Sequence, residues 1–247
     1  MTAVPRPENL PLPQGWGDDK LSEFLWLARN NQLVTFALKR SEYGKLREID
    51  AAFVQIGENL LNPKNLLSAN MLYRSHSAYR AACGTSMAGQ APETYVLLRS
   101  CLEFAGYGLF IFKSPELGIT WLNRHDGPDA TRAMKRAFQA VNVQKVVESA
   151  DARLGEIYRT LYERAIDFGG HPNVMSVTGN MTMNECDGRV EMNHLYLHGD
   201  DDALLMALKT TAQVGITSLH VLQHVFQERF MLLGLHEKLA QIQQMGL

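Results

Sequence analysis

Two residues near the end of a predicted helix have the side chains that phosphodiester cleavage requires. Arg164 borders the apolar stripe of the segment YRTLYERAIDFGGHPN, and His171 follows just after Gly169 and Gly170. The glycines allow the backbone to turn the imidazole back towards the guanidinium. A guanidinium can stabilise the charge of a phosphorane while an imidazole transfers a proton. We interpret Arg164 and His171 as a candidate catalytic pair that needs no metal ion. In the alternative interpretation, Arg164 pairs with Asp167 and His171 caps the helix.

A second pair of charges lies in a strongly apolar segment, ETYVLLRSCLEFAGYGLFIFK. Arg99 and Glu103 are four residues apart and share a helix face, with Tyr95 one turn before them. Charges are costly to bury unless they are paired. Either this pair ties the helix to a neighbour, through Arg74 or Arg80, or Tyr95, Arg99 and Glu103 line a polar binding pocket. The sequence leaves both interpretations open.

A third pattern is typical of metal ligands. His220, His224 and Glu228 follow each other at intervals of four residues in HVLQHVFQE. Histidines one helical turn apart can share a metal ion, with His194 or His198 as a further ligand. Carboxylate-bridged bundle proteins use two Glu-x-x-His motifs, whereas this chain has one, in a predicted strand. We therefore predict half-buried histidines and no metal or other cofactor, and keep a His-ligated metal-binding bundle as an alternative.

Composition excludes several classes of protein. The 247 residues are 46% hydrophobic and 20% charged, with a net charge of −2, so an RNA contact would need a local basic patch. Three separated cysteines argue against a disulfide framework and are typical of a reducing compartment. No signal-peptide pattern, Rossmann or P-loop glycine motif, GxSxG elbow or zincin motif is present. We expect a cytoplasmic protein that is not inserted in a membrane.

Most of the chain has helical periodicity. Residues 1–17 contain four prolines and are predicted to form an extended tail, and residues 18–247 a single helical domain. We expect helix caps at Asp18 or Asp19, at Ser41 and at Asn62, with Pro63 in the first turn and a loop at GTSMAGQA. The predicted helices cover about 20–40, 42–61, 63–82, 92–113, 128–138, 143–168 and 203–230. A short helix that carries Trp121 is expected after the cap at Ser114-Pro115-Glu116, and a further helix near the C-terminus.

The exception to this helical periodicity is a predicted hairpin near 180–198. The run TMNECDGRVEMNHLYL has a central Asp-Gly between β-favouring residues, which is a two-residue hairpin signal. The fold class we predict is therefore mainly α, a multi-helix bundle with one inserted β-hairpin. Its central helix spans Pro92 to Lys113, where Gly106 and Gly108 indicate close packing of another segment.

Arg164 and His171, with the six residues between them, resemble the motif of the HEPN superfamily. The surrounding Tyr158, Leu161 and His171-Pro172-Asn173 are similar to a set of uncharacterised bacterial helical proteins distantly related to that group. The resemblance covers about residues 92–230. Two departures are Ala165, where the family usually has a polar residue directly after the arginine, and the pair of glycines with the later hairpin.

The resemblance implies an RNA-cleaving or RNA-binding helical bundle that forms a homodimer. It implies Arg164 and His171 as the catalytic pair, with Glu103 as an acidic partner. Arg99, Tyr95 and Asn173 would complete the binding site. The alternative is a non-catalytic interaction or structural module, whose internal charges only stabilise the fold. Convergence of Arg164, His171 and Glu103 in one cleft would favour the enzyme.

Overall fold

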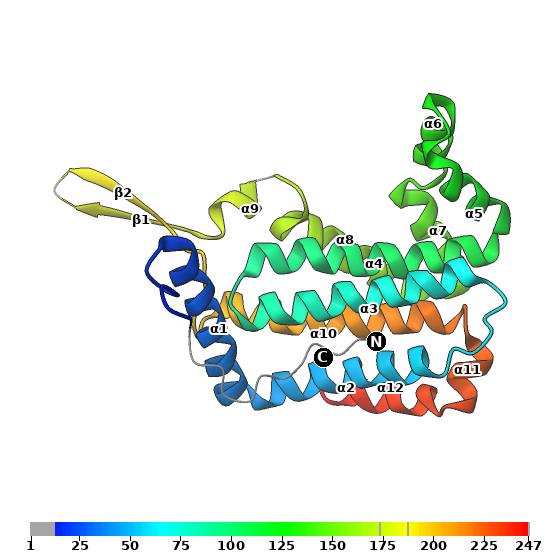
Figure 1. The fold of residues 1–247 in the computed structure, drawn as a ribbon, viewed down its shortest axis with the longest axis horizontal. Coiled ribbons are helices and arrows are strands. Elements are labelled where there is room, and N and C mark those ends of the chain that lie inside the picture. The colour runs from blue at the N-terminus through cyan, green and yellow to red at the C-terminus, as the bar shows by residue number, and fades with distance from the viewer. Residues whose placement is uncertain (1–12, 173, 187, 247) are drawn as a thin grey trace.

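The chain folds as a mainly α-helical bundle with one antiparallel β-hairpin, which confirms the predicted fold class (Figure 1). The structure is a computed structural model that describes residues 13–172, 174–186 and 188–246. Its helices are α1 (Lys20–Leu38), α2 (Arg40–Glu58), α3 (Leu66–Met87), α4 (Ala91–Lys113), α5 (Pro115–Leu122), α6 (Pro128–Ala137), α7 (Ala140–Ala150), α8 (Ala152–Ala165), α9 (Val174–Thr178), α10 (Asp202–Gln223), α11 (Gln227–Leu232) and α12 (Leu235–Gln244). The strands are β1 (Met181–Cys186) and β2 (Arg189–His194).

Helix α4 lies at the centre of the bundle, against α3, α10, α7 and α8. Its side chains on several faces are fully buried, among them Leu98, Cys101, Leu102, Ala105 and Leu109. This position explains why the helix is apolar nearly all round. Within the described residues, α4 is the one helix long and apolar enough to cross a membrane, but 56% of that stretch is buried inside the fold.

Two glycines of α4 allow the close packing that the sequence predicted. A Cβ on Gly106 would overlap the Tyr158 hydroxyl and Val143, because α7 and α8 lie directly against this turn. A Cβ on Gly108 would lie 3.4 Å from the Cβ of Met71 on α3. The Tyr158 hydroxyl donates to the Leu102 carbonyl at 3.0 Å and thereby joins α8 to α4.

Several predicted helix boundaries are wrong. Helix α2 begins at Arg40, and no side-chain hydrogen bond from Ser41 caps it. Helix α3 begins after Asn65, whose side chain accepts from the Ser68 amide at 2.9 Å, whereas Asn62 has a left-handed backbone with φ 49°. The predicted loop GTSM belongs to α3, because Thr85 and Ser86 donate their hydroxyls to carbonyls one turn back.

The expected helix over 143–168 is two helices and a π-helical turn. Asp151 separates α7 from α8 and caps α8 by accepting from the Leu154 amide at 2.8 Å. Residues Ile166–Gly170 form the π-helical turn, which packs against the start of α4. The last predicted long helix is also divided: α10 ends at Gln223, and the chain turns before α11 so that Val225 and Phe226 pack on the core.

Two segments project from the bundle, at opposite ends (Figure 1). One is the hairpin β1–β2, which the sequence correctly placed, with Met183 opposite Met192 in the register. The other contains α5 and α6, whose apolar side chains pack in a second hydrophobic cluster with Phe110, Phe138 and Val143. Of the predicted tail, residues 1–17, positions 1–12 lie outside the described residues.

Candidate functional site

Two polar side chains, one from α4 and one from α8, converge on one carboxylate oxygen of Glu103. Arg99 Nε donates to Glu103 Oε1 at 2.9 Å, and the Tyr162 hydroxyl donates to the same oxygen at 2.8 Å. The Arg99 guanidinium carbon lies 5.4 Å from the centre of the Tyr162 ring. Tyr158 and Tyr162 are one turn apart on α8, so both point towards α4. The predicted Arg99–Glu103 pair is therefore formed, and it is completed by a tyrosine from α8.

These side chains form one wall of a small pocket at the edge of the bundle. The pocket has a volume of about 170 Å³ and is lined by Arg99, Glu103, Tyr107, Phe138, Ala140, Val143, Tyr158 and Tyr162. The charged side chains stay in contact with solvent, with 31% of Arg99 and 34% of Glu103 exposed. The Arg99–Glu103 pair is thus neither a buried structural pair nor a fully solvated one, and it can meet a ligand.

Burial keeps Tyr162, the tyrosine bonded to Glu103, protonated. Burial and the neighbouring Glu103 carboxylate raise the pKa of Tyr162 to about 12. Burial alone would lower the pKa of Arg99, but the hydrogen bond and the charge of Glu103 raise it. At neutral pH Tyr162 is therefore a protonated phenol and Arg99 a guanidinium, and both donate to Glu103. This set suits binding of a polar or anionic group.

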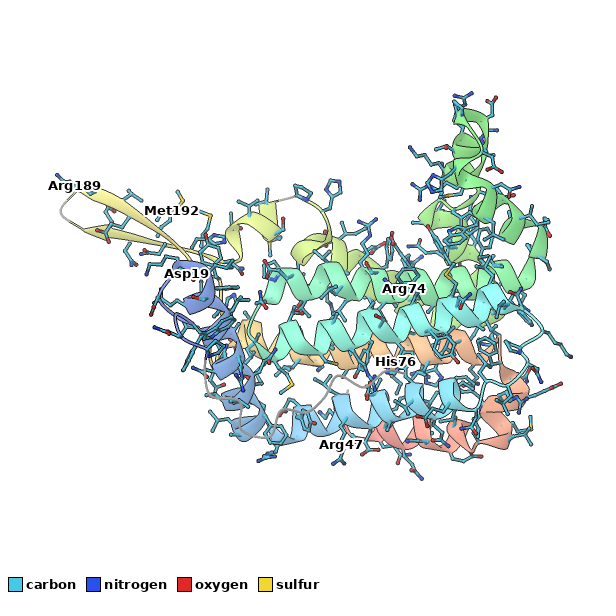
Figure 2. All side chains as sticks on the ribbon, viewed as in Figure 1. Asp19, Arg47, Arg74, His76, Arg189 and Met192 are labelled. Carbon is cyan, nitrogen blue, oxygen red and sulfur yellow. The ribbon has the colours of Figure 1, made fainter. Side chains whose placement is uncertain are left out.

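Further arginines give this region a local positive charge. Burial and Glu103 raise the pKa of Tyr107, whereas the charges of Arg124 and Arg99 oppose that rise, so both cations act on the pocket. The Arg74 guanidinium lies 5.1 Å from the centre of the Phe104 ring, on the next turn of α4. Figure 2 shows Arg74 on the side of the molecule where α3 and α4 run next to each other.

Arg164 belongs to a different group of side chains. Its Nη1 donates to Gln213 Oε1 on α10 at 2.9 Å. Burial raises the pKa of Tyr95, and a hydrogen bond with Thr210 and the charge of Arg164 oppose that rise, so Tyr95 lies with Arg164 rather than with Arg99. On α8, Arg164 and Tyr162 point in nearly opposite directions because they are two residues apart. The structure does not bring Arg164 and Glu103 together.

His171 lies on the surface just after the π-helical turn. Its Nδ1 is 3.2 Å from the Pro172 carbonyl oxygen, and its own carbonyl accepts from the Ser176 hydroxyl. Among the interactions of the described residues, His171 has none with Arg164, and Arg164 has no ion pair with Asp167. Asn173, which was predicted to join the binding site, lies outside the described residues. The predicted catalytic pair is therefore close in sequence but not hydrogen bonded.

The π-helical turn before His171 is held against the start of α4. The rings of Phe168 and Tyr95 have centres 5.3 Å apart, and a Cβ on Gly169 would overlap the Pro92 carbonyl. A bulky residue at position 169 would push the turn away from α4. Gly169 thus serves backbone packing here.

His220 and His224 line one pocket together with Asp151, but the other members of the metal-like pattern lie elsewhere. His220 lies in α10, His224 follows the end of that helix, and Glu228 lies in α11. His194 belongs to β2, and His198 is buried and hydrogen bonded elsewhere. Burial lowers the pKa of both His220 and His224. Within the described part of the chain, no group of three or more His, Cys, Asp or Glu side chains is placed to hold a metal ion.

Five residues of the pocket were missed by the analysis of the sequence: Tyr107, Phe138, Ala140, Val143 and Tyr162. Tyr162 had a usable signal, since it is one turn after Tyr158 and next to Leu161, and a buried tyrosine hydroxyl usually finds a partner. Phe138 had no comparable signal, because it reaches the pocket only through the packing of the α6–α7 connection.

Comparisons with known proteins add no residue to the site: no family model matches the chain, and no curated protein or solved structure matches it.

Proposed function

We propose that this protein is a cytoplasmic, HEPN-like RNA-binding protein that holds RNA at the Arg99–Glu103–Tyr162 pocket. The observation that carries the proposal is the convergence of the guanidinium, the carboxylate and the phenol at an open pocket of about 170 Å³. Arg99 would attract a phosphate oxygen, and the Tyr162–Glu103 hydrogen bond holds the carboxylate in place beside it.

The size of the pocket favours a polymer over a small cofactor. Pockets that enclose whole cofactors or drug-sized ligands are commonly about 300–1,000 Å³. A pocket of about 170 Å³ takes one group of a longer ligand, such as one phosphate or part of one nucleotide. The rest of such a ligand would lie on the surface beyond it.

The surroundings of the pocket match what single-stranded RNA requires. Arg74 and Arg124 add positive charge, which attracts phosphate groups from several ångströms away. Tyr107 provides a half-buried aromatic ring, on which an unpaired base can stack, and the buried Phe138 packs against that ring. A basic, aromatic-lined edge is the local patch that the overall composition requires of an RNA-binding protein.

Cleavage is the second part of the proposal, and it depends on His171. Its imidazole can transfer a proton between the ribose 2′-hydroxyl and the leaving oxygen, while Arg164 stabilises the phosphorane. For this, Arg164 must exchange its hydrogen bond with Gln213 for one with the bound phosphate.

That same hydrogen bond is the observation that favours a non-catalytic module. Gln213 satisfies part of the Arg164 guanidinium and fixes α8 to α10, so the arginine already has a structural role. In a protein of this kind RNA binding persists and His171 has no chemical effect.

The experiment measures binding and cleavage of labelled single-stranded RNA separately. We expect Arg99→Ala and Tyr162→Phe to weaken binding, and Arg99→Ala to reduce the slope of log K against log salt concentration by about one. The matched control is Arg47→Ala, because Arg47 is exposed on α2, on the opposite side of the molecule in Figure 2. RNA binding that is absent in the wild type, or equally weakened by Arg99→Ala and Arg47→Ala, would refute the proposed function.

His171→Ala tests the cleavage step at unchanged binding. Loss of product from this variant alone supports catalysis by His171. Equal product from wild type and variant excludes that role. RNA binding without any product supports the non-catalytic module.

A further inference from the structure

A cavity of about 380 Å³ lies at the end of the bundle opposite the hairpin. It is lined by residues 60–65 between α2 and α3, by Phe112 and Lys113 at the end of α4, and by residues 224–229 around the turn from α10 to α11. Figure 1 shows α11 and the start of α3 together at this end of the molecule. Sites for small molecules commonly have volumes of about 300–1,000 Å³, so this cavity is large enough to hold a whole small ligand.

Much of the lining is apolar, and part of it is open to solvent. Val225 is buried and Phe226 packs against the core, so these two side chains form a fixed wall. Leu61 and Phe112, in contrast, are 67% and 38% exposed. Exposed apolar side chains around a cavity favour a ligand with an apolar part, because binding removes apolar surface of both from water.

The charged side chains of the lining are mostly positive. Lys64, Lys113 and Arg229 are cationic, and Glu228 is the one carboxylate among the lining residues. Among the ion pairs of the described residues, none includes any of these four side chains. The cavity therefore has an excess of positive charge, which attracts an anionic group.

The charge of Lys113 acts on another residue of the lining, His224. Burial lowers the pKa of His224, the charge of Asp151 opposes this change, and the charge of Lys113 lowers the pKa further. The ammonium group is therefore close enough to His224 to repel its charged form. At the same distance it attracts an anion that lies in the cavity.

Arg229 joins two walls of the cavity before any ligand binds. Its Nη2 donates to the Leu61 carbonyl at 3.3 Å and so connects α11 with the segment between α2 and α3. Fixed walls reduce the conformational entropy that is lost when a ligand binds.

We propose that this cavity binds a small amphipathic anion, a free carboxylic acid with an apolar chain. The carboxylate would lie against the cationic side chains, and the apolar chain against Phe112, Val225 and Phe226. A neutral apolar ligand would leave the cations without a partner, and a small inorganic anion would leave Leu61 and Phe112 exposed to water. The inference does not depend on RNA binding, because the Arg99–Glu103–Tyr162 pocket shares no lining residue with this cavity.

Backbone amide NMR shifts, measured during titration with sodium octanoate below its micelle concentration, test the proposal. We expect octanoate to shift the resonances of residues 60–65, 112–113 and 224–229. Octanol and octylammonium have the same chain with a neutral or a cationic head, and should bind at least about threefold more weakly. Equal affinities for the three compounds, or shifts confined to other parts of the chain, would overturn the proposal.

Substitutions separate the role of charge from that of the apolar wall. Lys113→Met keeps a long side chain without its charge, and should weaken octanoate binding about two- to fivefold and leave octanol binding unchanged. The matched control is Lys145→Met, because Lys145 is exposed on α7 and does not line the cavity. Phe112→Ala should weaken the binding of octanoate and octanol alike, because it removes apolar surface that both chains cover.

A charge reversal keeps the test decisive if a variant is less stable. Lys113→Glu should weaken octanoate binding and strengthen octylammonium binding, an exchange of preference that partial unfolding cannot produce. The same preference in wild type and Lys113→Glu would contradict a role of Lys113 in binding the anion.

Vesicles and RNA identify other occupants of the same surface. Octanoate should bind in the absence of any lipid, and vesicles of phosphatidylcholine with phosphatidylserine should not sediment the protein. If octanoate produces no shifts while these vesicles sediment the protein, or while labelled RNA shifts the same resonances, the cavity does not bind a free acid and the proposal is wrong.

Discussion

At the scale of single residues, Asp50 shows how a charged group is held at the edge of the core. Its Oδ1 lies 2.7 Å from His76 Nε2 and accepts from Arg80 Nε at 2.7 Å, while Oδ2 accepts from Arg80 Nη2 at 2.9 Å. Burial alone would raise the pKa of Asp50, but the hydrogen bonds from His76 and Arg80 hold it well below the usual range. The carboxylate thus joins α2 to α3 through its charged form.

The depressed pKa predicts that Asp50 stabilises the fold less in acid. Its contribution is fully present above the ordinary carboxyl pKa near 3.8 and is lost as the pH falls towards the lower folded-state value. We expect Asp50→Asn to reduce the free energy of unfolding by about 1 kcal/mol at neutral pH, since the pair is partly exposed. Urea unfolding at about pH 7 and about pH 3 measures this, and the difference should shrink at the lower pH.

Asp129→Asn is the control for Asp50, because Asp129 is almost fully exposed and pairs only with Arg132 on its own helix. It should change the stability by a few tenths of a kcal/mol at most. A wild-type advantage over Asp50→Asn that stays constant down to about pH 3 would contradict the assignment of the pKa shift.

At the scale of elements, the packing of α4 against α7 and α8 depends on one missing side chain. Gly106 leaves room for the Tyr158 hydroxyl, which in turn donates to the Leu102 carbonyl. The same close approach of α8 brings Tyr162 to Glu103. The geometry of the pocket is therefore set by helix spacing and not by a local motif.

We predict opposite effects for two Gly→Ala substitutions. Gly106→Ala should destabilise the protein by about 1–3 kcal/mol, since the new methyl overlaps Tyr158 and Val143 in a packed core. Gly44→Ala, in the interior of α2 with open space around it, should stabilise by about 0.5–1 kcal/mol through helix propensity. Chemical denaturation of both variants measures the difference. Equal effects of the same sign would show that α8 does not pack as closely as described.

At the scale of the whole molecule, His198 and the nearby Asp201 are joined to three segments that are more distant in sequence. Its ring lies between Asn180 before the hairpin and Asp201 before α10. Its amide donates to the Gly89 carbonyl at 2.8 Å, between α3 and α4, and its carbonyl accepts from Asn31 of α1 at 2.7 Å. A single buried residue thus fixes the hairpin and α1 to the end of the bundle.

Removal of this side chain should loosen the hairpin more than the bundle. We expect His198→Ala to cost about 1–3 kcal/mol, because Asn180 and Asp201 lose a buried partner. Hydrogen exchange should rise over residues 181–194 and stay unchanged over 98–109 at the centre of α4. The control is His125→Ala, at an exposed position between α5 and α6. Uniform loss of protection in both regions would contradict a joint that acts on the hairpin.

Much of the fold could be predicted because the spacing of apolar residues indicates which face of each helix or strand is buried. The apolar run 92–113 identified the central helix, and Asp-Gly identified the hairpin. The wrong boundary at Asn62 arises because two asparagines near that helix start can cap, and Asn65 does so. Helix α2 instead starts at Arg40 without any side-chain cap, which the search for a capping residue could not foresee. The division of the segment 203–230 after Gln223 was hidden because both helices are apolar.

The candidate site, too, could be predicted only in part. The sequence by itself determined the mainly α bundle, its central helix and the pairing of Arg99 with Glu103, because these depend on neighbours three to seven residues apart. Only the tertiary structure decided that Tyr162 completes that pair and that Arg164 bonds to Gln213 of α10 instead of His171. The physical reason is rotation about the axis of α8: residues two positions apart point in nearly opposite directions, and only the placement of α4 and α10 gives each direction a partner.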